Sequence, residues 1–233
     1  MHKGKRFTAA LGKVDRRKDY ELSQAVVKMK ETATAKFDET VEVTINLGID
    51  PRKSDQMIRG SVTLPNGTGK SVRLLVLCKE DKAKEALAAG ADMAGLEEYI
   101  EKIQGGWLDI DQIVATPDVM PQVGKVGKIL GPRGLMPNPK TGSVTADVAT
   151  AVKEVKGGRI AFRVDKLGIL HIPFGKASFE APKLLENVQT VIAAVQRLKP
   201  PTAKGQFMKR ITLSSTMGPG IRVDRSSALA GVK

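Results

Sequence analysis

Few residues of this chain could perform acid–base, nucleophilic or metal chemistry. The 233 residues include one cysteine, Cys78, and two histidines, His2 and His171. This leaves too few imidazole and thiolate groups for a His-based triad or a metal cage, and an internal disulfide framework is excluded. We therefore assign no catalytic residue, no metal ligand and no cofactor, and we expect that the protein is not an enzyme.

One short segment could be mistaken for a nucleotide site. Residues 67–71 (GTGKS) resemble the end of a P-loop, whose backbone holds nucleotide phosphates. Leu64 stands where that motif needs its first glycine, and the residues that follow are typical of a strand. A P-loop needs a helix there, because the N-terminus of that helix holds the phosphate. We interpret the segment as a turn between domains.

The overall charge indicates a polyanionic partner. Lys and Arg number 38 and Asp and Glu 25, which gives a net charge of +13. A basic surface of this size attracts phosphate backbones and accelerates encounter with them. Net charge could also serve solubility alone, so the distribution of the charges is more informative than their sum.

The secondary structure predicted from hydrophobic periodicity divides the chain into three blocks. The outer blocks have an α+β pattern, with a helix beginning after Asp19 as its cap, a hairpin around residues 165–168, and a frayed tail over 226–233. Their predicted helices cover 20–34 and 183–198, and their predicted strands cover 41–47, 57–64, 159–164, 169–174, 207–213 and 221–223.

The middle block, residues 68–159, alternates short apolar strands with helices, which predicts a three-layer α/β (Rossmann-like) domain. Val72–Cys78 is almost entirely apolar, as expected for a strand covered on both faces. The other predicted elements are a strand over 112–115 and helices over 81–89, 96–104, 118–130 and 147–156.

Each outer block alone would bury only a marginal core. We therefore predict one discontinuous α+β domain, residues 1–67 plus 160–233, into which the α/β domain of residues 68–159 is inserted through a two-strand hinge. Residues 1–67 and 160–233 together carry 25 basic and 13 acidic side chains, whereas 68–159 carry 13 and 12. A nucleic acid should therefore bind to the discontinuous domain.

Two segments of the inserted domain could contact RNA in addition. Gly124–Gly127 (GKVG) has the G-x-x-G spacing of a KH loop, which clamps a nucleic-acid backbone. The connection over 130–142 is rich in Gly and Pro, and its length favours a functional, shaped loop. The possible secondary contacts are Lys125, Lys128, Arg133 and Lys140. A KH-like single-strand RNA-binding protein using the GKVG loop is the alternative function.

Two segments of the outer blocks allow both a structural and a functional interpretation. Phe37 beside Lys36 could be a core residue or could pack against a ribose or a base. The glycines of residues 216–220 (TMGPG) would let main-chain groups approach ribose hydroxyls, but the segment could also be a plain hairpin turn.

Five motifs together resemble the family of bacterial large-subunit ribosomal protein one, the protein of the mobile stalk beside the tRNA exit site. The resemblance runs from about Lys3 to Val223, and the tail after Asp224 extends beyond it. The motifs are AKFDETVE at 35–42, ATPDVM at 115–120, LGPRGLMPNPKTG at 130–142, GKASF at 175–179 and STMGP at 215–219.

The resemblance implies four RNA-contacting patches in the discontinuous domain. By matching position these are Lys36, Phe37 and Thr40 in the first; Asp165, Lys166 and Gly168 in the second; Lys176 and Ser178 in the third; and Thr216, Met217 and Gly218 in the fourth. Lysines would supply salt-sensitive affinity, and hydroxyl and main-chain groups would supply discrimination. Asp165 would accept from ribose hydroxyls or orient Lys166.

The resemblance also implies the function and the partners. The protein is expected to bind 23S rRNA at the stalk of the large ribosomal subunit, to assist release of deacylated tRNA from the exit site, and to repress its own operon mRNA through a site that mimics the rRNA. We expect a cytoplasmic, ribosome-bound protein that has no membrane partner and is a monomer away from the ribosome.

Overall fold

A computed structural model describes residues 4–230 of the chain. The chain folds into two compact units with mixed α/β structure and several sheets. The first unit joins the chain up to Gly69 to the chain from Ile160 onward, and the second unit is Lys70–Arg159. His2 and the last three residues of the tail lie outside the described residues. No helix within 4–230 is both long and apolar enough to cross a lipid bilayer.

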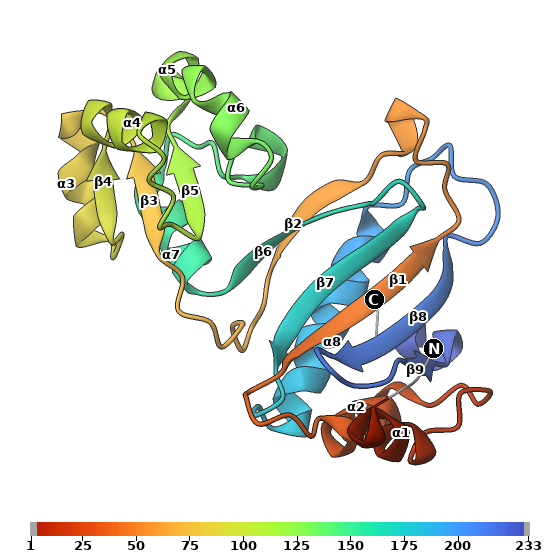
Figure 1. Cartoon of the computed structure of the whole chain (residues 1–233). Helices are drawn as coiled ribbons and strands as arrows, with labels where there is room; N and C mark the ends of the chain where they lie inside the picture. The colour runs from red at the N-terminus through yellow and green to blue at the C-terminus, as the bar shows by residue number, and fades with distance from the viewer. Residues whose placement is uncertain (1–3, 231–233) are drawn as a thin grey trace. The chain divides into compact units, whose positions relative to one another are not determined.

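A four-stranded antiparallel sheet forms the centre of the first unit (Figure 1). Its order is β7-β1-β8-β9, so strands from both ends of the chain lie side by side. In β1, buried residues alternate with half-exposed ones, as the apolar alternation of its sequence predicts. The strands are β1 (Thr40–Leu47), β7 (Ile169–Lys176), β8 (Met208–Ser215) and β9 (Ile221–Val223).

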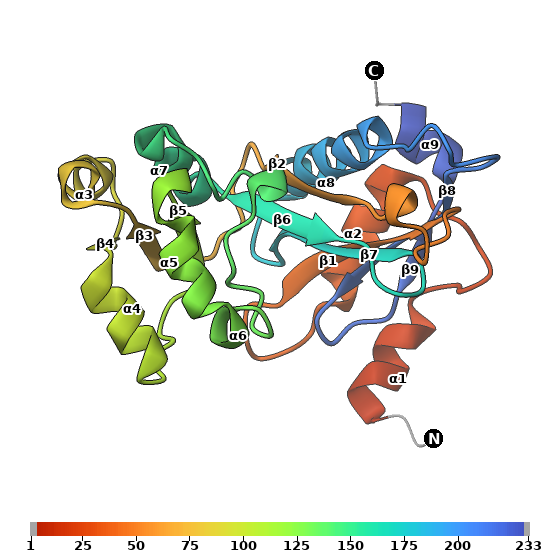
Figure 2. The same cartoon turned by 90° about the horizontal axis from the view of Figure 1, so that it is seen from above.

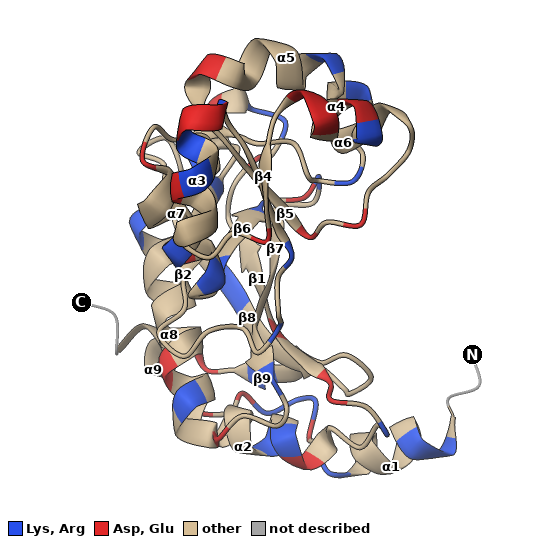
Figure 3. Ribbon diagram, turned by 90° about the vertical axis from the view of Figure 1, so that its left-hand side faces the viewer, with Lys and Arg blue, Asp and Glu red and all other residues tan. Residues whose placement is uncertain are grey.

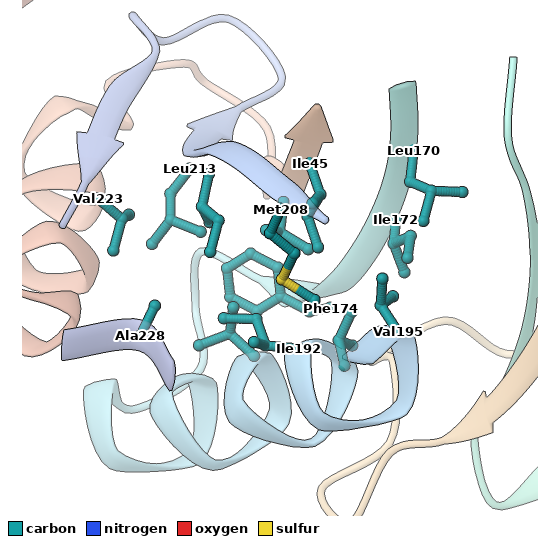
Figure 4. Close-up of a cluster of buried hydrophobic side chains, with 14 of the residues drawn as sticks. Ile45, Leu170, Ile172, Phe174, Ile192, Val195, Met208, Leu213, Val223 and Ala228 are labelled. Atoms are coloured by element: carbon teal, nitrogen blue, oxygen red, sulfur yellow. The ribbon is translucent and has the colours of Figure 1, made fainter. Parts of the chain in front are cut away.

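Helices cover one face of this sheet and enclose the core. Phe174 and Ile172 of β7, Ile45 of β1 and Leu213 of β8 pack with Ile192 of the long helix α8 (Figure 4). The covering helices are α2 (Leu22–Thr32), α8 (Ala181–Arg197) and α9 (Arg225–Ala230). Figures 2 and 3 show α8 on one side of the sheet.

The opposite face of the sheet, which we call the open face, carries polar side chains. Thr44 in β1 lies between His171 in β7 and Thr212 in β8, and Thr212 is opposite Arg222 in β9. The hydroxyl of Thr44 is 3.3 Å from His171 Nδ1. His171 and Arg222 are exposed and the two threonines are half-exposed, so the face is accessible across four strands.

The predicted hairpin around residues 165–168 is wrong in its pairing. The turn itself exists, but β6 (Arg159–Arg163) pairs with β2 (Arg59–Thr63) in a separate two-stranded sheet, whereas β7 pairs with β1. The chain therefore passes from one sheet to the other through this turn. A 3-10 turn, η1 (Ser54–Gln56), precedes β2.

Two terminal helices were not predicted from the sequence. The tail beyond residue 225 begins as α9 rather than as a frayed segment: Ala228 is completely buried, and Asp224 accepts the Ser227 N–H at 2.8 Å. Helix α1 (Lys5–Gly12) has one buried residue, Ala10. The expected cap Asp19 is also wrong, because α2 begins after Glu21 without a side-chain cap.

The second unit has three layers around a parallel sheet of order β4-β3-β5. The strands are β3 (Leu74–Leu77), β4 (Met93–Gly95) and β5 (Gln112–Ala115), and β3 is buried along its whole length. Leu75 and Leu77 pack toward the helices of one face, and Leu74 and Val76 toward those of the other. The first face carries α4 (Glu97–Gln104), η2 (Pro117–Val119), α5 (Met120–Lys125) and α6 (Gly127–Leu130); the second carries α3 (Glu80–Ala88) and α7 (Val148–Lys156).

Candidate RNA interface

Three of the four predicted contact patches meet at one end of the antiparallel sheet. Strand β1 begins at Thr40, and the antiparallel strands β7 and β8 end beside it. Thr40 lies opposite Lys176, and Val41 lies opposite Ser215. Residues far apart in the sequence therefore share one small surface, which we call the recognition end.

Thr216 and Lys176 both form hydrogen bonds with Thr40. The Thr216 hydroxyl accepts the Thr40 N–H at 3.0 Å and donates to the Thr40 carbonyl at 3.1 Å, and the Thr216 N–H donates to the same carbonyl at 3.0 Å. Lys176 Nζ donates to the Thr40 hydroxyl at 2.9 Å. These hydrogen bonds fix the positions of all three side chains within the protein itself.

A buried carboxylate, Glu39, organises the recognition end. Its side chain accepts the Ala35 N–H at 2.8 Å, the Ser215 hydroxyl at 2.7 Å and the Met217 N–H at 2.9 Å. Burial raises the pKa of this carboxyl, but the three hydrogen bonds outweigh burial and leave the pKa below its ordinary value. Glu39 is therefore ionised at neutral pH and holds the loop before β1 against the turn after β8.

A second carboxylate, Asp38, attaches the third patch to the first. The N–H and the hydroxyl of Ser178 donate to the two oxygens of Asp38, at 3.1 and 2.8 Å. Asp38 follows Lys36 and Phe37 in the chain, so the loop that carries those side chains is tied to β7 as well as to β8. Lys36 itself is exposed.

Two large apolar side chains remain exposed at this end. Phe37 is 54% and Met217 49% exposed, although the main chain around each is held by internal hydrogen bonds. Phe37 is thus not a core residue. The segment after β8 does connect β8 to β9, and it also presents Met217. A side chain at Gly218 would collide with the Ser215 hydroxyl, so this position needs glycine for space.

The second patch lies at the opposite end of the same sheet. The Leu47 N–H, at the end of β1, donates to the Gly168 carbonyl at 2.9 Å. The length of β1 therefore separates this patch from Thr40 by about 23 Å, at ~3.3 Å per residue. The structure thus brings the first, third and fourth predicted patches together and leaves the second apart.

Asp165 shapes the turn of the second patch. One of its oxygens accepts the N–H groups of Leu167 and Ile169, at 2.9 and 2.7 Å. Gly168 has a φ of +79°, a left-handed conformation that glycine adopts without strain. The turn leaves Lys166 exposed and Leu167 77% exposed.

The possible secondary contacts all lie on the surface of the second unit. Lys125 ends α5, Lys128 lies in α6, and Arg133 and Lys140 lie in the connection that follows; all four are exposed. Lys140 belongs to η3 (Pro139–Thr141), whose cap Asn138 accepts the Lys140 N–H at 2.9 Å, so this long connection has a defined shape.

The GKVG segment is not an open loop. Gly124 and Lys125 are helical residues of α5, Val126 is completely buried, and Gly127 begins α6. A backbone clamp of the KH kind needs exposed main chain, so this geometry argues against the KH-like alternative.

The residues that hold the surface in shape could not be recognised from sequence patterns. Glu39, Asp38 and Ser215 carry no such signal, because a single carboxylate or hydroxyl beside a predicted contact residue has no distinctive pattern in one sequence. Leu167 was missed as well, although an apolar residue inside a predicted polar turn is a usable signal. Within residues 4–230 no group of three or more His, Cys, Asp or Glu side chains could hold a metal ion.

Comparison with known proteins agrees with this picture of a basic, RNA-binding chain without catalytic machinery. A family model described as "Ribosomal protein L1p/L10e family" matches residues 29–219. The "Large ribosomal subunit protein uL1" of Chlorobium luteolum is 60% identical over 227 residues, which are 97% of this chain and 99% of the relative. The proteins of the same name from Chlorobaculum tepidum and Chlorobium phaeobacteroides are 60% and 57% identical, over 97% of this chain and 98% and 99% of theirs.

The class that fold, surface and comparisons define is that of an RNA-binding ribosomal protein. The chain belongs to the ribosomal protein L1p/L10e family. It is therefore a structural component of a ribonucleoprotein particle, bound to ribosomes in the cytoplasm, and not an enzyme.

Proposed function

We propose that the chain is a structural protein of the large ribosomal subunit that binds a folded segment of 23S rRNA at the base of the stalk. The observation that carries this proposal is the recognition end, where Glu39 and Asp38 together join three distant segments into one preformed surface. The first unit is the RNA-binding domain of this proposal, and the second unit is the inserted domain.

The RNA lies along the open face of the sheet. The recognition end and the turn of Asp165 are at opposite ends of β1, and a single RNA that contacts both must cross the face between them. That face offers hydroxyls at Thr44, Thr212 and Ser214. The minor groove of an RNA helix is wide and shallow and displays 2′-hydroxyls, which small hydroxyl side chains can bind.

Equilibrium binding across a salt series tests this proposal. The ligands are a stalk-base rRNA fragment and an unrelated hairpin of equal length. A preference for the fragment that persists at moderate salt is expected, because hydroxyl and main-chain contacts do not depend on counterion release. Equal binding of both RNAs that disappears as salt rises would contradict it. Sedimentation of the free protein should show a monomer.

A role in releasing deacylated tRNA from the exit site is the second part of the proposal. Four exposed cations of the second unit, Lys125, Lys128, Arg133 and Lys140, supply a surface for tRNA phosphates. Replacing all four by glutamine should slow tRNA release from ribosomes without weakening binding of the isolated protein to the rRNA fragment. Unchanged release kinetics would remove this assignment.

Repression of the chain's own operon would use the same surface as rRNA. An mRNA leader that mimics the rRNA site should compete with the rRNA fragment for one binding site. Met217→Asp should reduce the affinity for the mRNA leader and for the rRNA fragment by the same factor. Simultaneous binding of the two RNAs would show that the messenger uses another surface.

Tight local contacts on both sides of the first crossing support a hinge between the units. Before the first crossing, Asn187 of α8 donates to the Gly67 carbonyl at 3.0 Å and accepts the Asn66 N–H at 3.1 Å. After it, Lys70 Nζ donates to Asp111 at 2.8 Å. We infer pivots at the boundaries of the units, near residues 69–70 and 159–160. Different rotational correlation times for the two units in NMR relaxation are expected; one common value would contradict the hinge.

A further inference from the structure

The chain before α2 carries a basic surface that the candidate interface does not include. Residues 5–18, which we call the basic arm, comprise helix α1 and the loop after it. Figure 3 shows basic residues on α1. The arm has one acidic side chain, Asp15, and its exposed cations are Lys5, Arg6, Lys13, Arg16, Arg17 and Lys18.

The arm is attached to the first unit near the loop that precedes β1. Ala10 and Val14 are buried, and Lys13 Nζ donates to the carbonyl of Glu31 in the last turn of α2, at 3.4 Å. The Asp15 N–H donates to the Tyr20 hydroxyl at 3.0 Å. Helix α2 leads directly into the segment that contains Lys36 and Phe37. The arm and the recognition end are therefore both attached to helix α2.

Helix α1 extends on the side of the sheet that faces away from α8. Figures 2 and 3, two perpendicular views, both show this arrangement. This is the side of the open face, because the helices of the core cover the other side. The Arg6 guanidinium also helps, through space, to lower the pKa of Glu39, so the field of the arm reaches the recognition end.

The cations at both ends of the arm form no ion pair within the described part of the chain. Among residues 4–230, no carboxylate forms an ion pair with Lys5, Arg6, Arg16 or Arg17. By contrast, the cation Arg73 of the second unit is paired with Asp109 and Asp111. An accessible group of unpaired cations beside an RNA-binding face is complementary to phosphates.

We propose that the basic arm contacts the phosphate backbone of the RNA that lies on the open face, and that it adds affinity without adding sequence preference. This inference rests on the proposed binding of rRNA. Backbone contacts of this kind position an RNA and make its affinity salt-dependent, whereas discrimination comes from groups that read ribose and base edges.

The test compares two double variants by salt-dependent binding to the stalk-base fragment and the unrelated hairpin. Lys5→Gln with Arg6→Gln should reduce the affinity for both RNAs by the same factor, roughly tenfold at low salt. The slope of log affinity against log salt should fall by about two units, at ~0.9 per lost phosphate contact. The matched control is Arg197→Gln with Lys199→Gln, which removes equal charge from exposed residues in and after α8. The control should retain most of the slope.

Three outcomes would overturn the proposal. The first is an affinity and a slope for the arm variant equal to those of the control. The second is a selective loss of the stalk-base fragment, because that would mean that Arg6 acts by supporting Glu39. The third is a loss of lipid binding alone: the wild type binds phosphatidylserine vesicles, and the arm variant does not, although it binds RNA as the wild type does. This would make the arm a lipid-binding surface.

A second double variant separates the effect of the arm on RNA binding from the effect of Arg6 on the Glu39 carboxylate. Arg16→Gln with Arg17→Gln lies in the loop, away from α1, and should reproduce the reduced slope. Wild-type protein that fails to prefer the stalk-base fragment would contradict the proposed function, whatever the arm variants do. If the wild type prefers the stalk-base fragment but both arm variants keep the wild-type salt slope, only the proposal that the arm binds RNA would be contradicted.

Discussion

The carboxylate of Glu39 accepts the backbone N–H of Met217 at 2.9 Å, although 178 positions separate the two residues in the chain. The bond fixes the main chain of Met217 and leaves its side chain outside, 49% exposed. A buried anion therefore positions an exposed apolar group. This arrangement explains how a surface with few aromatic residues can still have a defined shape.

Glu39→Gln should destabilise the first unit by about 1–3 kcal/mol and weaken binding of the rRNA fragment. A glutamine keeps one acceptor oxygen but directs an NH₂ group at donors, which leaves a buried polar pair unmatched. Urea unfolding and RNA titration measure the two effects. Glu31→Gln, at an exposed ion pair on α2, is the control and should cost less than about 0.5 kcal/mol. Equal losses for both variants would contradict a special role of Glu39.

The same carboxylate should make stability depend on pH in the acid range. Because the folded-state pKa lies below the ordinary value of 4.5, the contribution of Glu39 is fully present above that pH. It is lost as the pH falls through the lower folded-state value. The difference in stability between wild type and Glu39→Gln should therefore be constant above pH 4.5 and shrink as the pH falls below that value. Parallel curves over the whole range would show that Glu39 does not titrate as described.

Met217→Asp should reduce specific RNA affinity by about 1–3 kcal/mol and leave the free energy of unfolding within about 0.5 kcal/mol of wild type. The side chain is half exposed, so its loss costs little in the free protein, while a charge there would repel phosphate. Leu87→Asp provides the control, because Leu87 is 50% exposed on α3 of the second unit. Titration of the stalk-base fragment should distinguish the two variants; indistinguishable affinities would exclude Met217 from the interface.

Lys36→Ala should weaken binding to the stalk-base fragment and to the unrelated hairpin together, and reduce the salt slope by roughly one unit. The side chain is exposed in the loop before β1, so it can contact a phosphate without holding the fold. Lys84→Ala, an exposed lysine on α3 of the nearly neutral second unit, should leave the slope unchanged. Loss confined to the stalk-base fragment would instead mean that Lys36 reads a base or a ribose.

Substitutions at Asp165 can separate its acceptor oxygen from its charge. Asp165→Asn keeps an oxygen for the N–H groups of Leu167 and Ile169, and should retain RNA affinity or raise it slightly, since a negative charge near phosphate is removed. Asp165→Ala removes the acceptor and should weaken binding by loosening the turn. RNA titrations of the pair decide the role. Equal binding by alanine and wild type would show that the turn does not contact RNA.

The sequence predicted the larger elements because their hydrophobic patterns are strong. The alternation in β1 and the continuous apolar run of β3 are both present in the structure. The strands β5 and β9 begin and end at the predicted residues. Helix α1 and strand β4 were missed, because one helix with a single buried residue and one strand of three residues have almost no periodicity.

The interface was predictable only in part, and for a different reason. Thr40, Lys176 and Thr216 could be named by resemblance, but their convergence depends on the order β7-β1-β8, which periodicity does not specify. The hydrogen-bond network of Glu39 depends on this strand pairing, so no local sequence pattern predicts it. The false hairpin had the same origin: the turn signal was correct, but the partners of β6 and β7 are distant in the chain.

The position of β1 at the centre of its sheet constrains the order of events during synthesis. Both neighbours of β1 begin after residue 168, so this apolar strand leaves the ribosome long before its partners exist. At ~5–20 residues per second the delay is roughly 6–24 s. The second unit is complete within that interval and can fold first, while residues 40–47 wait as an unpaired strand. Nascent chains of this protein should therefore depend on chaperones in their N-terminal third, and not in the middle.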